Sequence, residues 1–141
     1  MKRSPIHRWH EKAGATLADE QGWYVALRYS DAADEASAVG ASVGVCDLSH
    51  ISETLSPYAR FLIAGPHARG VLSKLTSLNL EPTSAYGSVA HVRALVDRHN
   101  LGFVVMIPRD YAESVWEAVL HAGEEFHIKP FGLEALRRLE R

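Results

Sequence analysis

Residues 44–66, GVCDLSHISETLSPYARFLIAGP, hold the features that decide the fold. The first part, residues 44–50, combines a glycine with short polar side chains and predicts a turn. It has neither the glycine spacing of a phosphate loop nor the serine elbow of a hydrolase, and it has no paired metal ligands. The second part, residues 55–64, ends in large apolar residues and predicts a strand, and Gly65-Pro66 marks the start of a helix.

The composition is that of an ordinary globular domain. The 141 residues are 47% hydrophobic and 23% charged, with a formal net charge of −2, and we expect residues 1–141 to form one domain with no nucleic-acid partner. No apolar run approaches the roughly 20 residues of a membrane span, and the basic start lacks the apolar core of a signal peptide, so we expect no membrane association and a cytoplasmic location. The single cysteine, Cys46, excludes an internal disulfide and is predicted to be a small buried hydrophobic residue.

The first fifty residues predict a helix, a strand and a second helix. The first helix spans residues 5–17, the strand spans residues 23–29, and the second helix spans residues 32–43 and ends at a glycine. His7 and His10 lie one turn apart on the first helix. No third ligand lies near them, so the sequence predicts no metal site.

The remainder predicts a ferredoxin-like α+β fold. From residue 55 the expected order is strand, helix, strand, strand, helix, strand, over residues 55–64, 65–75, 88–97, 103–107, 110–122 and 124–128. This order is the split βαβ pattern, to which the first fifty residues add a helix-strand-helix extension. Residues 103–107 are apolar enough for burial on both faces, and Leu133, Leu136 and Leu139 suggest a terminal helix.

Residues 88–97 alternate in polarity, as expected of one strand. One face carries an imidazole, a guanidinium and a carboxylate, from His91, Arg93 and Asp97. This face is the best physical candidate for a binding or catalytic site. The alternative is a solvent-facing sheet surface or a subunit contact.

Several motifs together carry a resemblance to a known family. GVCDLSH at residues 44–50 is similar to the G-L-F-D-x-S-H segment of the glycine-cleavage T-protein (aminomethyltransferase) superfamily. IAGPHARGVLSKLTSLNL and KPFGLEALR, at residues 63–80 and 129–137, also resemble segments of that family and follow in the same order. The likeness extends over nearly the whole chain.

The resemblance implies a tetrahydrofolate-binding protein that passes a one-carbon unit from an amine to folate. It implies that Asp97 is the carboxylate near the folate nitrogen and that Arg93 is a partner for the glutamate tail. The implied cofactor contacts are Asp47, Ser49, His50, Ile51, His91 and Arg93. For Asp47, Ser49 and His50 the alternative is turn and capping hydrogen bonding.

The chain also departs from the family pattern. It lacks segments like G-G-x-x-D-D and T-G-Y-T-G-E-x-G-x-E, and it stops after GLEALRRLER, where members of the family continue into a C-terminal barrel that we do not expect here. In these respects it resembles the small gamma subunit of heterotetrameric sarcosine oxidase. A third branch, which supports iron–sulfur enzymes, fits poorly because its K-G-C-Y-x-G-Q-E motif is absent.

Two functions follow as hypotheses. The first is a small non-catalytic subunit of a folate-linked, flavin-dependent amine demethylase of the sarcosine oxidase type. In that case FAD or FMN would be bound only by a flavoprotein partner. The second is a stand-alone tetrahydrofolate-binding aminomethyl- or methyltransferase, acting as a homo-oligomer if the pocket is completed between chains.

Overall fold

The computed structural model describes residues 2–51 and 57–141, which form two open β-sheets and five α-helices. The large sheet has the order β6-β7-β8-β5-β4-β9 and the small sheet the order β1-β3-β2. The strands are β1 (Lys2–Arg3), β2 (Thr16–Glu20), β3 (Trp23–Arg28), β4 (Gly44–Asp47), β5 (Tyr58–Ala64), β6 (Ser84–Val89), β7 (Val92–His99), β8 (Gly102–Pro108) and β9 (Lys129–Pro130). The helices are α1 (His7–Lys12), α2 (Ala32–Ala41), α3 (Ala68–Ser73), α4 (Ala112–Ala122) and α5 (Leu133–Leu139). None of the helices in the described ranges has the length and apolar character needed to cross a bilayer.

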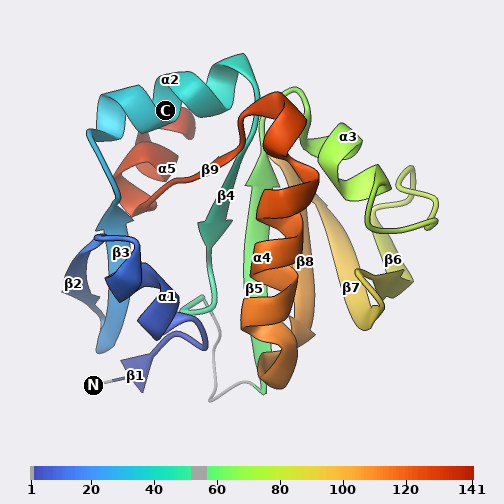
Figure 1. Cartoon of the computed structure of the whole chain (residues 1–141), viewed down its shortest axis with the longest axis horizontal. Coiled ribbons are helices and arrows are strands. Elements are labelled where there is room, and N and C mark those ends of the chain that lie inside the picture. The colour runs from blue at the N-terminus through green and yellow to red at the C-terminus, as the bar shows by residue number, and fades with distance from the viewer. Residues whose placement is uncertain (1, 52–56) are drawn as a thin grey trace.

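The large sheet confirms the predicted α+β fold. Strands β5, β7, β8 and β9, with α3 after β5 and α4 after β8, follow the expected strand-helix-strand-strand-helix-strand order. Strand β4 is inserted between β5 and β9, antiparallel to β5 and parallel to β9, and β6 extends the opposite edge. Helix α4 lies across one face of the sheet, and α2, α5 and the small sheet lie to the other side (Figure 1).

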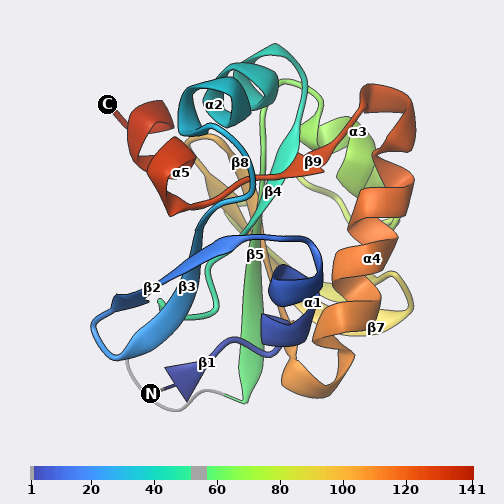
Figure 2. The same ribbon diagram turned by 60° about the vertical axis from the view of Figure 1, so that its left-hand side comes forward.

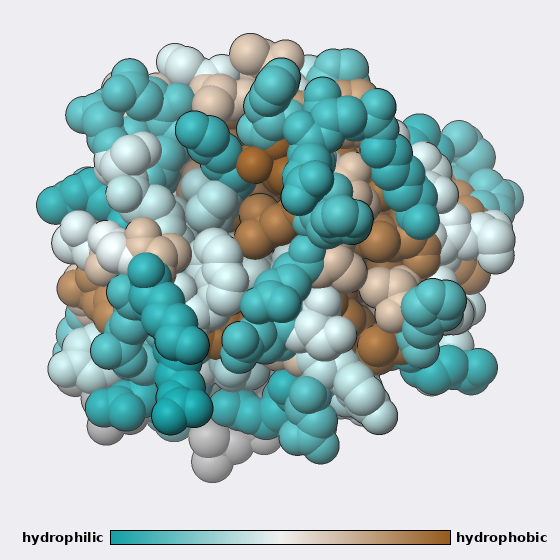
Figure 3. Space-filling view, viewed as in Figure 1, coloured by the Kyte–Doolittle hydropathy of each residue, from teal (hydrophilic) through white to brown (hydrophobic). Residues whose placement is uncertain are grey.

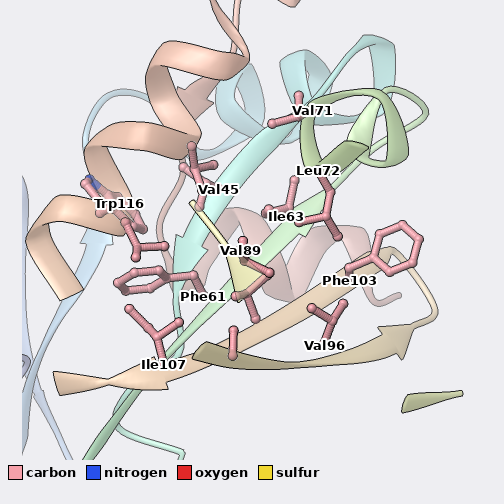
Figure 4. Close-up of a cluster of buried hydrophobic side chains, with 14 of the residues drawn as sticks. Val45, Phe61, Ile63, Val71, Leu72, Val89, Val96, Phe103, Ile107 and Trp116 are labelled. Atoms are coloured by element: carbon pink, nitrogen blue, oxygen red, sulfur yellow. The ribbon is translucent and has the colours of Figure 1, made fainter. Parts of the chain in front are cut away.

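The core is divided between the two faces of the large sheet. Under α3 and α4, Phe61, Ile63 and Val105 are fully buried in one cluster. The ring of Trp116 in this cluster meets Phe61 edge to face at 5.0 Å between centroids (Figure 4). A second cluster joins the opposite face to α2, α5 and β3, and it includes Cys46 at 1% exposure, as predicted. Burial of apolar area at both faces therefore fixes the sheet between two helical layers.

Residues 44–47 form a buried strand, and the prediction of a turn over residues 44–50 is wrong for this half. Val45 packs into one core cluster and Cys46 into the other, as expected of an internal strand covered on both faces. Helix α2 ends at Ala41, so Gly44 does not cap it. A side chain at Gly44 would meet Val39 at 2.6 Å, which explains the glycine.

The predicted single strand over residues 88–97 is also wrong. Ala90 and His91 have φ angles of +50° and +67° and form the two-residue turn of the β6–β7 hairpin. Val89 and Val92 are paired across this turn, so Val89 lies in the core with Ala94 and not on the face of Arg93.

Three other features differ from the sequence prediction: the length of the first helix, the burial of β8 and the element at residues 124–128. The first helix is only α1, since Gly14 takes a φ of +78° after it and Leu17 lies in β2. Residues 103–107 alternate between buried and half-buried side chains because only one face of β8 is covered along its whole length. The expected strand over residues 124–128 is a 3-10 turn, Glu124–Phe126, followed by β9. The expected strand residues 55 and 56 lie outside the described residues.

Candidate functional site

A cleft of about 800 Å³ lies between the β2–β3 turn, the segment after β4, and α5. Helix α5 lies above the β2–β3 hairpin on one side of the molecule (Figure 2). The described lining residues are Glu20, Gln21, His50, Ile51, Arg60, Leu133, Leu136, Arg137 and Glu140. This volume falls within the range of roughly 300–1,000 Å³ that is usual for small-molecule sites.

Charged side chains of both signs surround the cleft. Arg137 Nη2 lies 2.5 Å from Glu20 Oε1, so an ion pair joins α5 to the end of β2. Arg60 Nη1 donates to the carbonyl oxygen of Ile51 at 3.2 Å. The floor is apolar because Leu133 and Leu136 line it, and both side chains are almost fully buried. The cleft therefore offers an apolar surface with guanidinium and carboxylate groups at its rim.

His50 lines this cleft and is half-buried. Burial lowers the pKa of its imidazole, which the Asp47 and Glu20 carboxylates oppose and the Arg137 guanidinium reinforces. The net direction is downward, so His50 is a neutral imidazole at pH 7, with one nitrogen that donates and one that accepts.

Asp47 holds the backbone that presents His50 and Ile51. Its Oδ1 accepts hydrogen bonds from the Ser49 backbone N–H at 3.0 Å and from Ser49 Oγ at 2.6 Å. Ser49 Oγ in turn accepts from the backbone N–H of Arg60 at 3.1 Å. This arrangement is the turn hydrogen bonding that the sequence offered as the alternative role of Asp47 and Ser49. Neither side chain is among the residues that line the cleft.

The other oxygen of Asp47 joins a buried polar network. Oδ2 accepts from Ser4 Oγ and lies 2.8 Å from His10 Nε2, and His10 Nδ1 lies 2.7 Å from the Tyr29 hydroxyl. Because an ionised carboxylate only accepts, His10 donates from Nε2, and Tyr29 donates to Nδ1 when the ring is neutral. Burial acts to raise the Asp47 pKa, but the hydrogen bonds and charge of His10 and the bonds from Ser4 and Ser49 outweigh it, so the pKa is lowered.

This network involves residues that the sequence analysis did not select. Ser4, His10 and Tyr29 lie in the first thirty residues, whereas Asp47 lies in the large sheet, so the network fastens the N-terminal segment to the core. One signal was present in the sequence: His10 lies four residues after Ile6, on the apolar face of the first helix. Its exposure is 1%, and a polar ring buried to this extent requires partners. Burial also raises the Tyr29 pKa, and nearby Cys46, Asp47 and Glu35 add to the rise.

The residues predicted on the 88–97 face lie elsewhere. Arg93 stacks over the Tyr86 ring at 4.9 Å, Asp97 Oδ1 accepts from Ser84 Oγ at 2.5 Å, and His91 is at the hairpin turn. Strands β8 and β5 separate β7 from β4, a distance of about 14 Å at the usual strand spacing. The structure thus brings His50 and Ile51 together and does not bring the β7 residues to them. Whether either group binds a ligand stays a prediction.

Comparisons with known proteins agree with the resemblance. The family model of the GCVT N-terminal domain matches residues 51–141. The aminomethyltransferase of Desulfitobacterium hafniense (strain Y51) is 22% identical over 226 residues, covering 96% of this chain and 62% of that protein. The aminomethyltransferase of Acidobacterium capsulatum is 39% identical over 101 residues, covering 64% of this chain and 27% of that protein. The crystal structure of glycine cleavage system aminomethyltransferase T from Bartonella henselae has a TM-score of 0.77 at 16% identity, covering 95% of this chain and 60% of that one.

The chain spans at most about three fifths of the length of these relatives. The alignment with the Desulfitobacterium protein takes in 226 residues, more than the 141 of this chain, so that relative has internal segments that this chain lacks. This difference agrees with the two motifs missing from the sequence. The structural likeness shows the shared fold, and the family model covers well over half of the chain. The chain therefore belongs to the family defined by the GCVT N-terminal domain, within the T-protein superfamily.

Proposed function

We propose that this protein binds tetrahydrofolate and acts in one-carbon transfer, and that the cleft beside His50 is its folate site. The observation that carries the proposal is a cleft of about 800 Å³ beside the GVCDLSH segment, in a chain whose relatives are named aminomethyltransferases. From the sequence alone, this function is the second hypothesis, after the oxidase subunit. The relatives favour it over that subunit.

The chemistry of the lining suits folate. The exposed Ile51 side chain and the apolar floor of Leu133 and Leu136 offer a surface for a flat ring. Carboxylates such as Glu20 accept hydrogen bonds from ring N–H groups, and a guanidinium such as Arg60 binds a tail carboxylate in bidentate fashion. In this proposal Arg60 takes the role that the sequence analysis gave to Arg93.

Calorimetric titration of the isolated protein with tetrahydrofolate tests this proposal. We expect micromolar binding, and loss of one guanidinium in Arg60→Gln should weaken it by about tenfold, because a hydrogen bond to a charged group contributes roughly 1.5–3 kcal/mol. The control is the Arg93→Ala, Asp97→Ala double variant, which removes the β7 candidates and should bind as the wild type does. Absence of binding, or loss of binding in the control but not in Arg60→Gln, would refute the cleft as the folate site.

A second candidate is a non-catalytic subunit beside a flavoprotein that carries FAD or FMN. One observation favours it: Asp97 on β7, the predicted catalytic carboxylate, accepts a hydrogen bond from Ser84 on β6 and lies away from the cleft. Light scattering on the purified protein separates a monomer from a homo-oligomer. A complex purified from the native source should show flavin absorbance if this candidate is correct, and robust folate-dependent transfer by the isolated chain would contradict it.

A further inference from the structure

A second cleft, of about 360 Å³, lies where β1 and α1 meet the beginning of α4. These segments are side by side at the lower edge of the molecule (Figure 1), where hydrophilic side chains cover the surface (Figure 3). Its side chains come from two distant parts of the sequence: Arg3, Ser4, His7, Arg8, Arg109 and Asp110. None of them lines the cleft beside His50.

Among the described lining residues, three are arginines and only one, Asp110, is acidic. Within residues 2–51 and 57–141, the guanidinium groups of Arg3, Arg8 and Arg109 have no hydrogen bond and no ion pair. By contrast, Arg28, Arg69 and Arg137 each pair with a glutamate. The lining thus concentrates two net positive charges at one place, although the whole chain has a formal charge of −2.

The backbone that carries these arginines is fixed. Arg3 is paired with Tyr24 in the small sheet, and Arg8 lies within α1. The backbone N–H of Arg109 donates to the carbonyl oxygen of Pro57 at 2.7 Å. Arg109 begins the 3-10 turn Arg109–Tyr111 that leads into α4, so the positive end of that helix dipole adds to the local potential. The backbone positions that carry the three arginines are therefore fixed before any ligand arrives, which lowers the main-chain part of the entropic cost of binding.

His7 supplies a second observation at the wall of this cleft. Its Nε2 lies 2.8 Å from Glu11 Oε1, whereas its Nδ1 is buried and has no hydrogen-bond partner among the described residues. Buried polar atoms are rarely left without a partner in folded proteins. His7 Nδ1 is therefore a polar atom at this cleft whose hydrogen bond the described residues leave unmade.

We propose that this cleft binds a small molecule carrying a doubly charged oxyanion, either a phosphate monoester or a dicarboxylate. The planar guanidinium group offers paired N–H donors that match both kinds of oxyanion, and three of them exceed the charge of one dianion. The cleft has room for such a group together with a few attached atoms. The inference does not rest on the proposed folate site, because the two clefts share no residue.

Two titrations followed by amide NMR test the proposal, one with inorganic phosphate and one with succinate, both at constant ionic strength. We expect saturable shifts around residues 3–8 and 109–112. Tighter binding of phosphate would identify the ligand as a phosphate monoester, and tighter binding of succinate would identify it as a dicarboxylate. The Arg8→Gln, Arg109→Gln double variant should weaken binding by about a hundredfold, because each lost charged hydrogen bond accounts for roughly tenfold.

The matched control is the Arg138→Gln, Arg141→Gln double variant, which removes two exposed arginines outside the cleft. It lowers the net charge equally and should bind like the wild type. The amide spectra also show that each variant remains folded. The proposal is overturned if neither anion saturates below about 10 mM, or if the two double variants bind equally well.

Discussion

Replacing Asp47 by asparagine should destabilise the fold and change its response to acid. Asp47 accepts hydrogen bonds from Ser4 and His10 through one oxygen and from Ser49 through the other, and its side chain is 7% exposed. An asparagine oxygen can keep the bonds to Ser49. Its NH2 group would then face the donors of Ser4 and His10, so two charge-assisted hydrogen bonds in the interior are lost.

The magnitude follows from the number of bonds lost. Hydrogen bonds to a charged group contribute roughly 1.5–3 kcal/mol each, and breaking a buried charged pair costs about 3–5 kcal/mol. A change of tautomer at His10 recovers part of this loss because Nε2 can then accept from the new NH2 group. We therefore expect a loss of about 3 kcal/mol at pH 7, which corresponds to about 10 °C in Tm for a chain of this size.

The pH dependence has a definite sign. The folded-state pKa of Asp47 lies below its usual value, so the ionised carboxylate stabilises the fold above about pH 4 and this contribution is lost as the pH falls further. The Asp47→Asn variant has no such group. The difference in unfolding free energy between wild type and variant should therefore have its largest value at pH 7 and become smaller below pH 4.

Urea unfolding at pH 7, 5, 4 and 3 measures this difference. Asp97→Asn is the control, since the Asp97 side chain is half-buried and, among the described residues, bonds only Ser84. This variant should stay within about 1 kcal/mol of the wild type. The reasoning is refuted if Asp47→Asn is as stable as Asp97→Asn at pH 7, or if its deficit is undiminished at pH 3.

Four other substitutions test the packing, a turn and a set of backbone hydrogen bonds. Gly102→Ala would place a Cβ 2.0 Å from the Ile63 carbonyl oxygen and should lower the stability by at least about 3 kcal/mol. Gly40→Ala, in open space on α2, should instead raise the stability by about 0.5–1 kcal/mol. If thermal unfolding ranks the two variants in the opposite order, the β5–β8 packing is contradicted. His91→Gly should gain about 1 kcal/mol in urea unfolding because it relieves a left-handed φ of +67°, and a loss would contradict the hairpin turn. Glu35→Ala should cost about 3 kcal/mol, since Glu35 accepts from three backbone N–H groups at 6% exposure; a neutral result in the same assay would refute that role.

The elements predicted correctly are those whose sequence signal lies within one short segment of the chain. Helix α4 shows this best: Val115, Trp116 and Val119 recur at the spacing of one helix face, all three are buried, and Gly123 ends the helix as expected. The apolar residues of β5 and the order of the strands and helices around it were also predictable. Each of these signals lies within one segment of about ten residues.

The β6–β7 turn was missed because its residues give no turn signal. Ala90 and His91 are neither glycine nor asparagine, the residues that usually occupy left-handed turn positions. The polarity alternates on both sides of the turn, so the pattern reads as one continuous strand. Pairing of Val89 with Val92 is what distinguishes the hairpin, and only the folded chain shows it.

The cleft and the buried network could not be predicted from sequence patterns, for a different reason. Glu20 and Arg137 form an ion pair although 117 residues separate them, and His10 and Asp47 are 37 residues apart. No periodicity connects such positions. The GVCDLSH segment did identify one wall of the cleft, because His50 and Ile51 follow directly from the Asp47 turn, but the opposite wall comes from α5 and the β2–β3 turn.

The separation of β4 from β7 constrains any chemistry of the isolated chain. A carboxylate that assists a reaction must lie within hydrogen-bond reach of the reacting group. Asp97 is about three strand spacings from β4, too far to act on a molecule held at His50 unless that molecule spans the sheet face between them. Among the described residues, the carboxylates that line the cleft are Glu20, already paired with Arg137, and Glu140. If the isolated chain transfers a one-carbon unit in this cleft, Glu20 and Glu140 are the described glutamates placed to supply the carboxylate.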